Sequence, residues 1–322
     1  MAADILWFLA GLLALVAGAE VMVRGGSTLA AHLGISPIVV GLTVVSIGTS
    51  LPELAVGVVA AAEGSGALAV GNIAGTNVVN LLLILGLSAA LVPLALEQRT
   101  IRAELPMMAA AALLLWLLAA DGTLTRTDGL ILVLCAIVYT VAVVNGARRE
   151  SRATREQYDV QFGAPEIPGR LVLTQLAITV TGIVVVVIGA EWLVDGAVGI
   201  ANRWGVSDAF IGLTVVAIGT SAPELVTTVI STIRGNRDIA VGNLIGSSIY
   251  NILLILGVTC AVPANGLQLP SSLVNVDIPI MVAVVAVCVP IFITGRRVSR
   301  AEGIAMVAAY IVYLSYLILT QA

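Results

Sequence analysis

The chain has 322 residues, of which 59% are apolar and only 11% are charged, and its formal net charge is −4. A soluble domain carries about 25% charged residues. The composition, with a mean hydropathy of +1.09, therefore predicts a polytopic membrane protein. The basic residues are all arginines and His32 is the one histidine, which argues against lysine-dependent and histidine-rich catalysis. The acidic balance argues against a nucleic-acid partner. We expect neither an enzyme nor a resident cofactor.

Ten apolar segments are long enough to cross a bilayer core about 30 Å thick, and they predict an all-α protein with ten transmembrane helices. The segments are 5–23, 36–62, 67–92, 105–120, 129–146, 171–194, 207–233, 239–262, 274–294 and 301–320. If they alternate in direction, every arginine except Arg126 and Arg203 falls on one side of the membrane. The positive-inside rule then places the linker of residues 147–170 in the cytoplasm and both termini outside. The predicted location is the inner (plasma) membrane of the cell.

The chain contains an internal repeat. Residues 41–54 recur as residues 212–225, with twelve of fourteen positions identical at an offset of 171 residues. This predicts two five-helix repeats, residues 1–146 and 171–322, joined by the linker. Because five is an odd number, the second repeat must enter the membrane from the opposite side. Inverted repeats are typical of secondary transporters, whose binding site lies near the bilayer midplane.

Two glutamates occupy equivalent positions near the middle of predicted spans two and seven. A carboxylate at the centre of a membrane helix costs about 2.5 to 3.5 kcal/mol on insertion scales, so Glu53 and Glu224 require a cation, a proton or a partner. Pro52 and Pro223 precede them, and proline removes a backbone hydrogen bond inside a helix. We therefore expect both helices to be broken at the glutamates.

Hydroxyl and amide oxygens surround the two glutamates. Four hydroxyls lie beside the predicted breaks and belong to Thr49, Ser50, Thr220 and Ser221. On the following helices, two sets of polar residues are spaced by four, namely Asn72, Thr76 and Asn80, and Asn243, Ser247 and Asn251. Oxygen ligands with two negative charges suit a hard cation such as Ca²⁺. The hydroxyls could instead bond back onto the kinked helices, and the amides could join neighbouring helices.

The two Gly-Thr-Ser-x-Pro-Glu segments are each followed by Gly-Asn-x-x-Gly-[Ser/Thr]-x-x-x-Asn. They resemble the alpha-repeats of the Ca²⁺/cation antiporter superfamily, and most closely its bacterial and archaeal sodium/calcium exchanger branch. The resemblance implies a ten-helix fold whose second, third, seventh and eighth helices enclose four cation sites. It implies that the Ca²⁺ site falls on Thr49, Glu53, Thr220 and Glu224.

The same resemblance implies three Na⁺ sites around the Ca²⁺ site. One outer site shares Thr49 and Glu53 with the Ca²⁺ site and adds the Ser46 carbonyl and Thr76. The other shares Thr220 and Glu224 and adds the Ala217 carbonyl and Ser247. The middle site consists of Asn80 and Asn251 with the two glutamates, and Ser50 and Ser221 also line the cavity.

The function that the resemblance implies is electrogenic exchange of Na⁺ for Ca²⁺ by alternating access, in a monomeric transport unit within the lipid bilayer. Moving Ca²⁺ out against a gradient of about 10⁴ and about 100 mV costs about 10 kcal/mol, and each entering Na⁺ returns about 3.7 kcal/mol. About three Na⁺ are therefore needed. The alternative is an H⁺-coupled antiporter for Ca²⁺ or another divalent cation. Because Asn251 stands where some relatives carry Asp, the ion ratio and K⁺ dependence stay open.

Two different classes of membrane protein fit the sequence less well. A passive channel is more naturally an oligomer around one axis, whereas both glutamates lie in one chain. An intramembrane enzyme would need paired aspartates or a Ser/His pair at membrane depth, but His32 lies near the end of a span.

Overall fold

The computed structural model describes residues 1–33, 35–96, 98, 100–162, 169–204 and 217–321. These residues are mainly helical, with two short strand pairs. The α-helices are α1 (Ala2–Leu33), α2 (Pro37–Val40), α3 (Ser46–Thr49), α4 (Leu51–Ala62), α5 (Gly66–Val78), α6 (Leu85–Leu91), α7 (Leu105–Leu118), α8 (Arg126–Phe162), α9 (Gly169–Arg203), α11 (Ala217–Thr220), α12 (Ala222–Ile233), α13 (Arg237–Tyr250), α14 (Gly257–Thr259), α15 (Ile278–Ile293) and α16 (Arg300–Gln321).

Short helical turns, some wider and some tighter than an α-helix, connect several of these helices. The π-helical turns are η1 (Gly41–Val45), η2 (Val79–Ile84), η3 (Thr100–Glu104), η6 (Asn251–Leu256) and η7 (Leu273–Asp277), and the 3₁₀ turns are η4 (Ala119–Asp121) and η8 (Thr294–Arg296). Several π-helical turns recur at equivalent positions of the two predicted repeats. At the offset of 171 residues η2 overlaps η6 in all but one residue, and η3 aligns with η7 at an offset of 173.

Seven of the described helices are long and apolar enough to cross a membrane, and the bent segment from α2 to α4 makes an eighth if it is one span. The shorter α12 is apolar as well. Each predicted span overlaps helical residues, although the first part of span 207–233 lies outside the described residues. The chain is therefore a helical multi-pass membrane protein, and the count of ten spans stays a prediction.

The helix α8 is longer than the predicted span 129–146. It continues to Phe162, inside the predicted linker. Residues 147–162 contain neither proline nor glycine and are rich in Ala, Arg, Glu and Gln, which favour helix in water as well as in lipid. Hydropathy marks where a helix leaves the bilayer, so it could not indicate where the helix itself ends. Residues 163–168 of the predicted linker lie outside the described residues.

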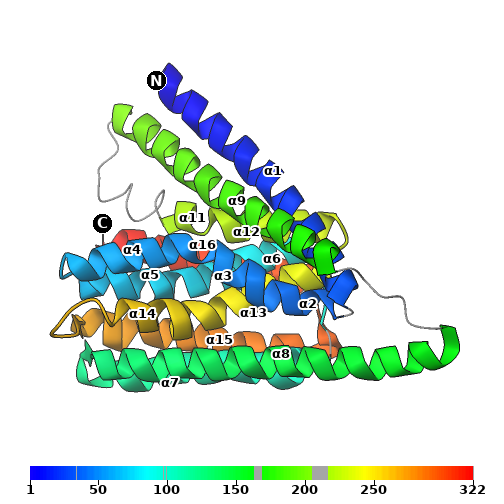
Figure 1. Ribbon diagram of the computed structural model, residues 1–322. Coiled ribbons are helices and arrows are strands. Elements are labelled where there is room, and N and C mark those ends of the chain that lie inside the picture. Colours follow the sequence, from blue (N-terminus) through cyan, green and yellow to red (C-terminus); the bar gives the residue numbers. More distant parts are fainter. Residues whose placement is uncertain (34, 97, 99, 163–168, 205–216, 322) are drawn as a thin grey trace.

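The helices α1 and α9 form an antiparallel pair that runs obliquely across the other helices (Figure 1). The remaining long helices lie roughly parallel to one another, and α13 is buried almost all around at their centre. A separate cluster of buried side chains, including Leu15, Met22 and Val186, joins α1 to α9. The outer face of α1 exposes Leu6 and Leu13, as expected of a helix in contact with lipid.

Glycines bring α1 and α9 into close contact. They recur every seven residues on both helices, as Gly11, Gly18 and Gly25 on α1 and Gly182, Gly189 and Gly196 on α9. A Cβ atom on Gly18 would lie 2.8 Å from the backbone nitrogen of Val186. Small residues that let backbones approach are a common basis of helix association in membranes. The pair is thus expected to behave as one rigid unit.

We expect Gly18→Ala to lower the free energy of unfolding by about 1–3 kcal/mol, because the added methyl group overpacks the interface. The matched control is Gly26→Ala on the same helix, where a Cβ would lie 3.4 Å from Val40 Cγ1, an ordinary contact. Thermal unfolding of both variants in detergent provides the comparison. Equal stability of the two variants would contradict the close approach of α1 and α9.

Two short antiparallel ladders connect the predicted repeats. β1 (Leu94–Ala95) pairs with β4 (Arg297–Val298), and β2 (Thr123–Leu124) pairs with β3 (Leu267–Gln268). Each ladder therefore joins one strand from each half of the chain. Since α7 separates β1 from β2 along the chain, the ladders lie at opposite ends of the helical bundle.

Candidate functional site

Both predicted helix breaks are present. The helix stops at Ser50, where the chain bends by 40° before α4, and at Ser221 before α12. The two serines have nearly the same backbone angles, φ −86° and ψ 6° for Ser50 and φ −86° and ψ 3° for Ser221. Pro52 and Pro223 are each the second residue of the new helix, where no hydrogen-bond donor is needed.

The breaks place Glu53 and Glu224 in the first turn of α4 and α12. Negative charge is favoured there by the unpaired N–H groups at the start of a helix. Both side chains are fully buried and interact electrostatically with each other. Both carboxylate oxygens of Glu53 and Oε2 of Glu224 have no hydrogen-bond partner among the described residues. The structure therefore joins the two predicted acids in one buried site with unused acceptors.

The hydroxyls of the first break face residues of the second half. Ser50 Oγ donates to Glu224 Oε1 at 3.5 Å. Thr49 Oγ1 donates to Asn243 Oδ1 at 3.2 Å and lies 3.4 Å from Ser247 Oγ, both on α13. Thr49 and Ser247 also interact with the Glu224 carboxylate. The two predicted repeats thus meet at the glutamates.

The amides predicted for the middle site lie in the π-helical turns. Asn80 is in η2 and Asn251 begins η6, and both side chains are fully buried. Neither amide has a hydrogen-bond partner among the described residues, for oxygen or nitrogen. π-helical turns are rare and frequent at functional sites. An unpaired buried amide is costly, so both side chains are suited to a polar ligand.

The remaining predicted ligands are also placed inside the protein. Thr76 and Ser247 are buried on α5 and α13, and Thr220 and Ser221 are buried beside the second break. The Ser221 hydroxyl has no hydrogen-bond partner among the described residues. Ala217 is the first residue of α11, and its side chain lies outside the description.

Ser46 has a second role that the sequence did not predict. Its hydroxyl donates to the Gly41 carbonyl at 2.6 Å and lies 3.0 Å from the Asn243 carbonyl on α13. Its carbonyl, the predicted ligand, accepts the backbone N–H of Ser50 at 3.1 Å. One lone pair of that carbonyl is therefore already used. Ser46 holds the broken helix against α13, and its role as a ligand stays a prediction.

A row of hydroxyls on α12 was not predicted from the sequence. These side chains follow Glu224 at helical spacing and are buried, namely Thr227, Thr228, Ser231 and Thr232. Thr228 Oγ1 accepts a hydrogen bond from Asn243 Nδ2 at 3.3 Å, which also fixes the amide that contacts Thr49. The spacing of three and four residues after Glu224 was the available signal. The equivalent positions after Glu53 are Val56, Gly57, Ala60 and Ala61, which carry no hydroxyl. The comparison of the two repeats therefore did not indicate this row.

The site offers carboxylate, hydroxyl, amide and carbonyl oxygens to a ligand. Such ligands favour hard cations, whereas Zn²⁺ and copper prefer sulfur and imidazole nitrogen. Within the described part of the chain, no three side chains of His, Cys, Asp or Glu come close enough to share a metal. The oxygen atoms and the two negative charges of Glu53 and Glu224 therefore suit an alkali or alkaline-earth cation.

Comparison with known proteins identifies the family. The family model described as sodium/calcium exchanger protein matches residues 3–145 and 174–319. The chain belongs to the sodium/calcium exchanger family. Exchangers are transporters, and this agrees with the buried, oxygen-rich site.

Two relatives are similar to this exchanger over almost their whole length. It is 33% identical over 314 residues to the inner membrane protein YrbG of Escherichia coli, covering 95% of this chain and 94% of YrbG. It is 31% identical over 347 residues to the sodium/calcium exchanger MaX1 of Methanosarcina acetivorans, covering 97% of each. The structure is similar to that of the sodium-calcium exchanger NCX_Mj soaked with 10 mM Na⁺ and zero Ca²⁺. The TM-score is 0.84 at 28% identity, covering 99% of both chains.

Proposed function

We propose that this exchanger is an electrogenic antiporter that exchanges Na⁺ for Ca²⁺ by alternating access. The observation that carries the proposal is the meeting of Glu53 and Glu224, fully buried, with three carboxylate oxygens that have no hydrogen-bond partner among the described residues. Two carboxylates at membrane depth are costly unless cations or protons neutralise them. Na⁺ and Ca²⁺ compete for the same two charges, so the binding of one releases the other.

The proposed Ca²⁺ site consists of Thr49, Glu53, Thr220 and Glu224. The outer Na⁺ sites use Thr76 with the Ser46 carbonyl and Ser247 with the Ala217 carbonyl, each beside one glutamate. Asn80 and Asn251 complete the middle site, and Ser50 and Ser221 line the cavity. The burial of these hydroxyls and amides supports the assignment, since polar groups inside a membrane protein need partners.

The proposed architecture is ten transmembrane helices in two inverted repeats, residues 1–146 and 171–322, joined by a cytoplasmic linker. Three observations support it. The family model matches once in each half, equivalent π-helical turns recur, and each strand ladder pairs one half with the other at opposite ends of the bundle. The arginine distribution supports an inner-membrane protein with both termini outside.

The proposed stoichiometry is about three Na⁺ for each Ca²⁺, because fewer could not drive Ca²⁺ against a gradient of about 10⁴. Such an exchange moves net charge. One chain supplies both glutamates, so the proposed transport unit is a monomer in the bilayer.

Uptake of ⁴⁵Ca²⁺ into proteoliposomes tests the proposed function. We expect rapid uptake into vesicles loaded with Na⁺, little uptake into vesicles loaded with K⁺ at the same pH, and faster uptake when an inside-positive potential is imposed. The potential matters because Na⁺ leaving the vesicle carries out more charge than Ca²⁺ brings in. Uptake that follows an imposed pH gradient and ignores Na⁺ would replace Na⁺ by H⁺ as the coupling ion.

A further inference from the structure

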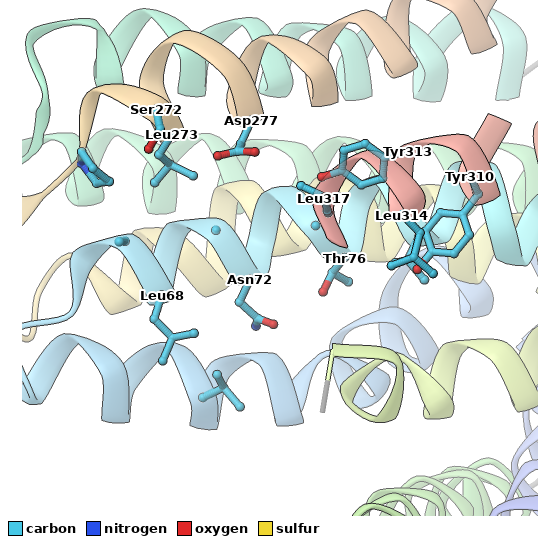
Figure 2. Close-up of a pocket in the computed structure, with 16 residues that line it drawn as sticks. Leu68, Asn72, Thr76, Ser272, Leu273, Asp277, Tyr310, Tyr313, Leu314 and Leu317 are labelled. Atoms are coloured by element: carbon cyan, nitrogen blue, oxygen red, sulfur yellow. The ribbon is translucent and has the colours of Figure 1, made fainter. Parts of the chain in front are cut away.

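A second cavity, of about 500 Å³, lies beside the proposed transport site, between α4, α5, α16 and the segment from Pro270 to Asp277 (Figure 2). Its wall is mainly apolar and includes the leucines Leu68, Leu273, Leu314 and Leu317. Small-molecule sites are typically apolar cavities of about 300–1,000 Å³ with a few converging polar groups. The size and lining of this cavity match that description.

The charge of the cavity is negative. Asp277 is the one charged group among the described lining residues, which include no arginine. The Asp277 carboxylate is half-buried and has no ion pair with a described residue. A carboxylate at the edge of a leucine-lined cavity attracts a cation, and repels an anionic lipid headgroup.

Aromatic rings stand next to this charge. Tyr310 and Tyr313 line the cavity with their ring centres 6.5 Å apart. Figure 2 shows the hydroxyl end of Tyr313 directed toward Asp277, and the two groups interact electrostatically. Tyrosine rings attract organic cations through their faces. A metal ion would gain little from rings and leucines, so this lining selects a cation with an apolar body.

The wall formed by α5 adds a hydrogen-bond donor. Asn72 lines the cavity, and its buried Nδ2 has no hydrogen-bond partner among the described residues. A buried donor without a partner costs free energy that a ligand oxygen would recover. Thr76 lies one turn further along α5 and lines the same cavity.

We propose that this cavity binds an amphiphilic organic ammonium ion, with the ammonium group at Asp277 and Tyr313, the apolar body between the leucines, and a carbonyl oxygen at Asn72. A molecule bound there contacts Thr76, a residue of one proposed Na⁺ site, and is expected to inhibit ion exchange. That inhibition rests on the proposed function, whereas the binding itself does not.

Binding of tetracaine to the purified chain in a nonionic detergent tests the proposal. Tetracaine carries a tertiary ammonium, an ester carbonyl and an apolar arylamine. Its neutral counterpart is the ester in which a CH group replaces the ammonium N–H. We expect tetracaine to bind the wild type more tightly than the neutral ester, and Asp277→Asn to weaken tetracaine by about tenfold without weakening the ester. Asp238→Asn is the matched control, a half-buried acid on α13 outside the cavity.

A second variant tests the location. A Cβ atom on Gly75 would meet nothing within 4 Å although Gly75 lines the cavity, so Gly75→Leu fills space and should weaken both ligands. Gly71→Leu, where a Cβ would meet Leu273 Cδ1 at 3.8 Å, serves the same purpose. Equal tetracaine affinity of the wild type and Asp277→Asn, or of the wild type and both glycine variants, would overturn the proposal. Because binding is measured without transport, failure of Na⁺-driven Ca²⁺ uptake leaves this result unaffected.

Discussion

Replacing Glu53 or Glu224 by Gln is expected to reduce Na⁺-driven Ca²⁺ uptake by about two to four orders of magnitude. Each substitution keeps the shape of the side chain and removes one of the two negative charges that Ca²⁺ meets in the buried site. Removing one partner of a buried ionic contact costs about 3–5 kcal/mol, which corresponds to that loss of affinity. Initial rates of ⁴⁵Ca²⁺ uptake at several Ca²⁺ concentrations measure the effect.

The matched control is Glu63→Gln. Glu63 directly follows α4, the helix that carries Glu53, but the Glu63 side chain is exposed. Its uptake rate should stay close to that of the wild type. A Glu53→Gln variant that transports Ca²⁺ as fast as Glu63→Gln would show that the buried pair is not the Ca²⁺ site.

Thr49→Val is expected to raise the Ca²⁺ concentration needed for half-maximal uptake by about tenfold to a hundredfold. Valine has nearly the same shape, so the main change is the loss of a buried hydroxyl that contacts Asn243 and Ser247 and borders Glu224. Interactions of a polar group with a charged one contribute about 1.5–3 kcal/mol. Uptake rates across a Ca²⁺ titration, with immunoblots for protein amount, give this value.

Thr43→Val provides the comparison for this hydroxyl. Thr43 lies in the same broken span, but its Oγ1 donates to the Val39 carbonyl at 2.7 Å within the helix. Removing that bond leaves the site unchanged, so the half-maximal concentration should not move. If both valine variants shift equally, the loss comes from a general weakening of the span and not from a ligand at Thr49.

The sequence predicted the breaks and the meeting of the two glutamates because both follow from local chemistry and repetition. Pro52 and Pro223 cannot continue a helix from the preceding turn, and the break appears beside each of them. A carboxylate in an apolar span has few stable environments. When the same acid occurs at equivalent positions of two repeats, a shared site becomes the simplest prediction, and in the structure the two glutamates are buried and interact with each other.

Other features depend on tertiary contacts that hydropathy does not encode. In the sequence, the glycines of α1 are ordinary for a membrane helix. Their role in close packing follows only from the contact with α9. Glu20 aligns with Glu191 in the repeats, yet it pairs at 2.8 Å with Arg234, whose equivalent in the other repeat is Glu63. The π-helical turns at Asn80 and Asn251 leave no clear sequence signature. The hydroxyls of α12 have no equivalents in the first repeat, so the symmetry of the repeats does not predict them.

Equilibrium binding of ⁴⁵Ca²⁺ to the purified protein, titrated with Na⁺, tests most directly whether the two ions share the site at Glu53 and Glu224. We expect one Ca²⁺ per chain, displaced by Na⁺ along a curve steeper than that of a single competing ion, with no saturable binding in Glu53→Gln. The steepness follows from several Na⁺ replacing one Ca²⁺. Ca²⁺ binding that persists unchanged at saturating Na⁺, or that survives in Glu53→Gln, would contradict a shared site at the two glutamates.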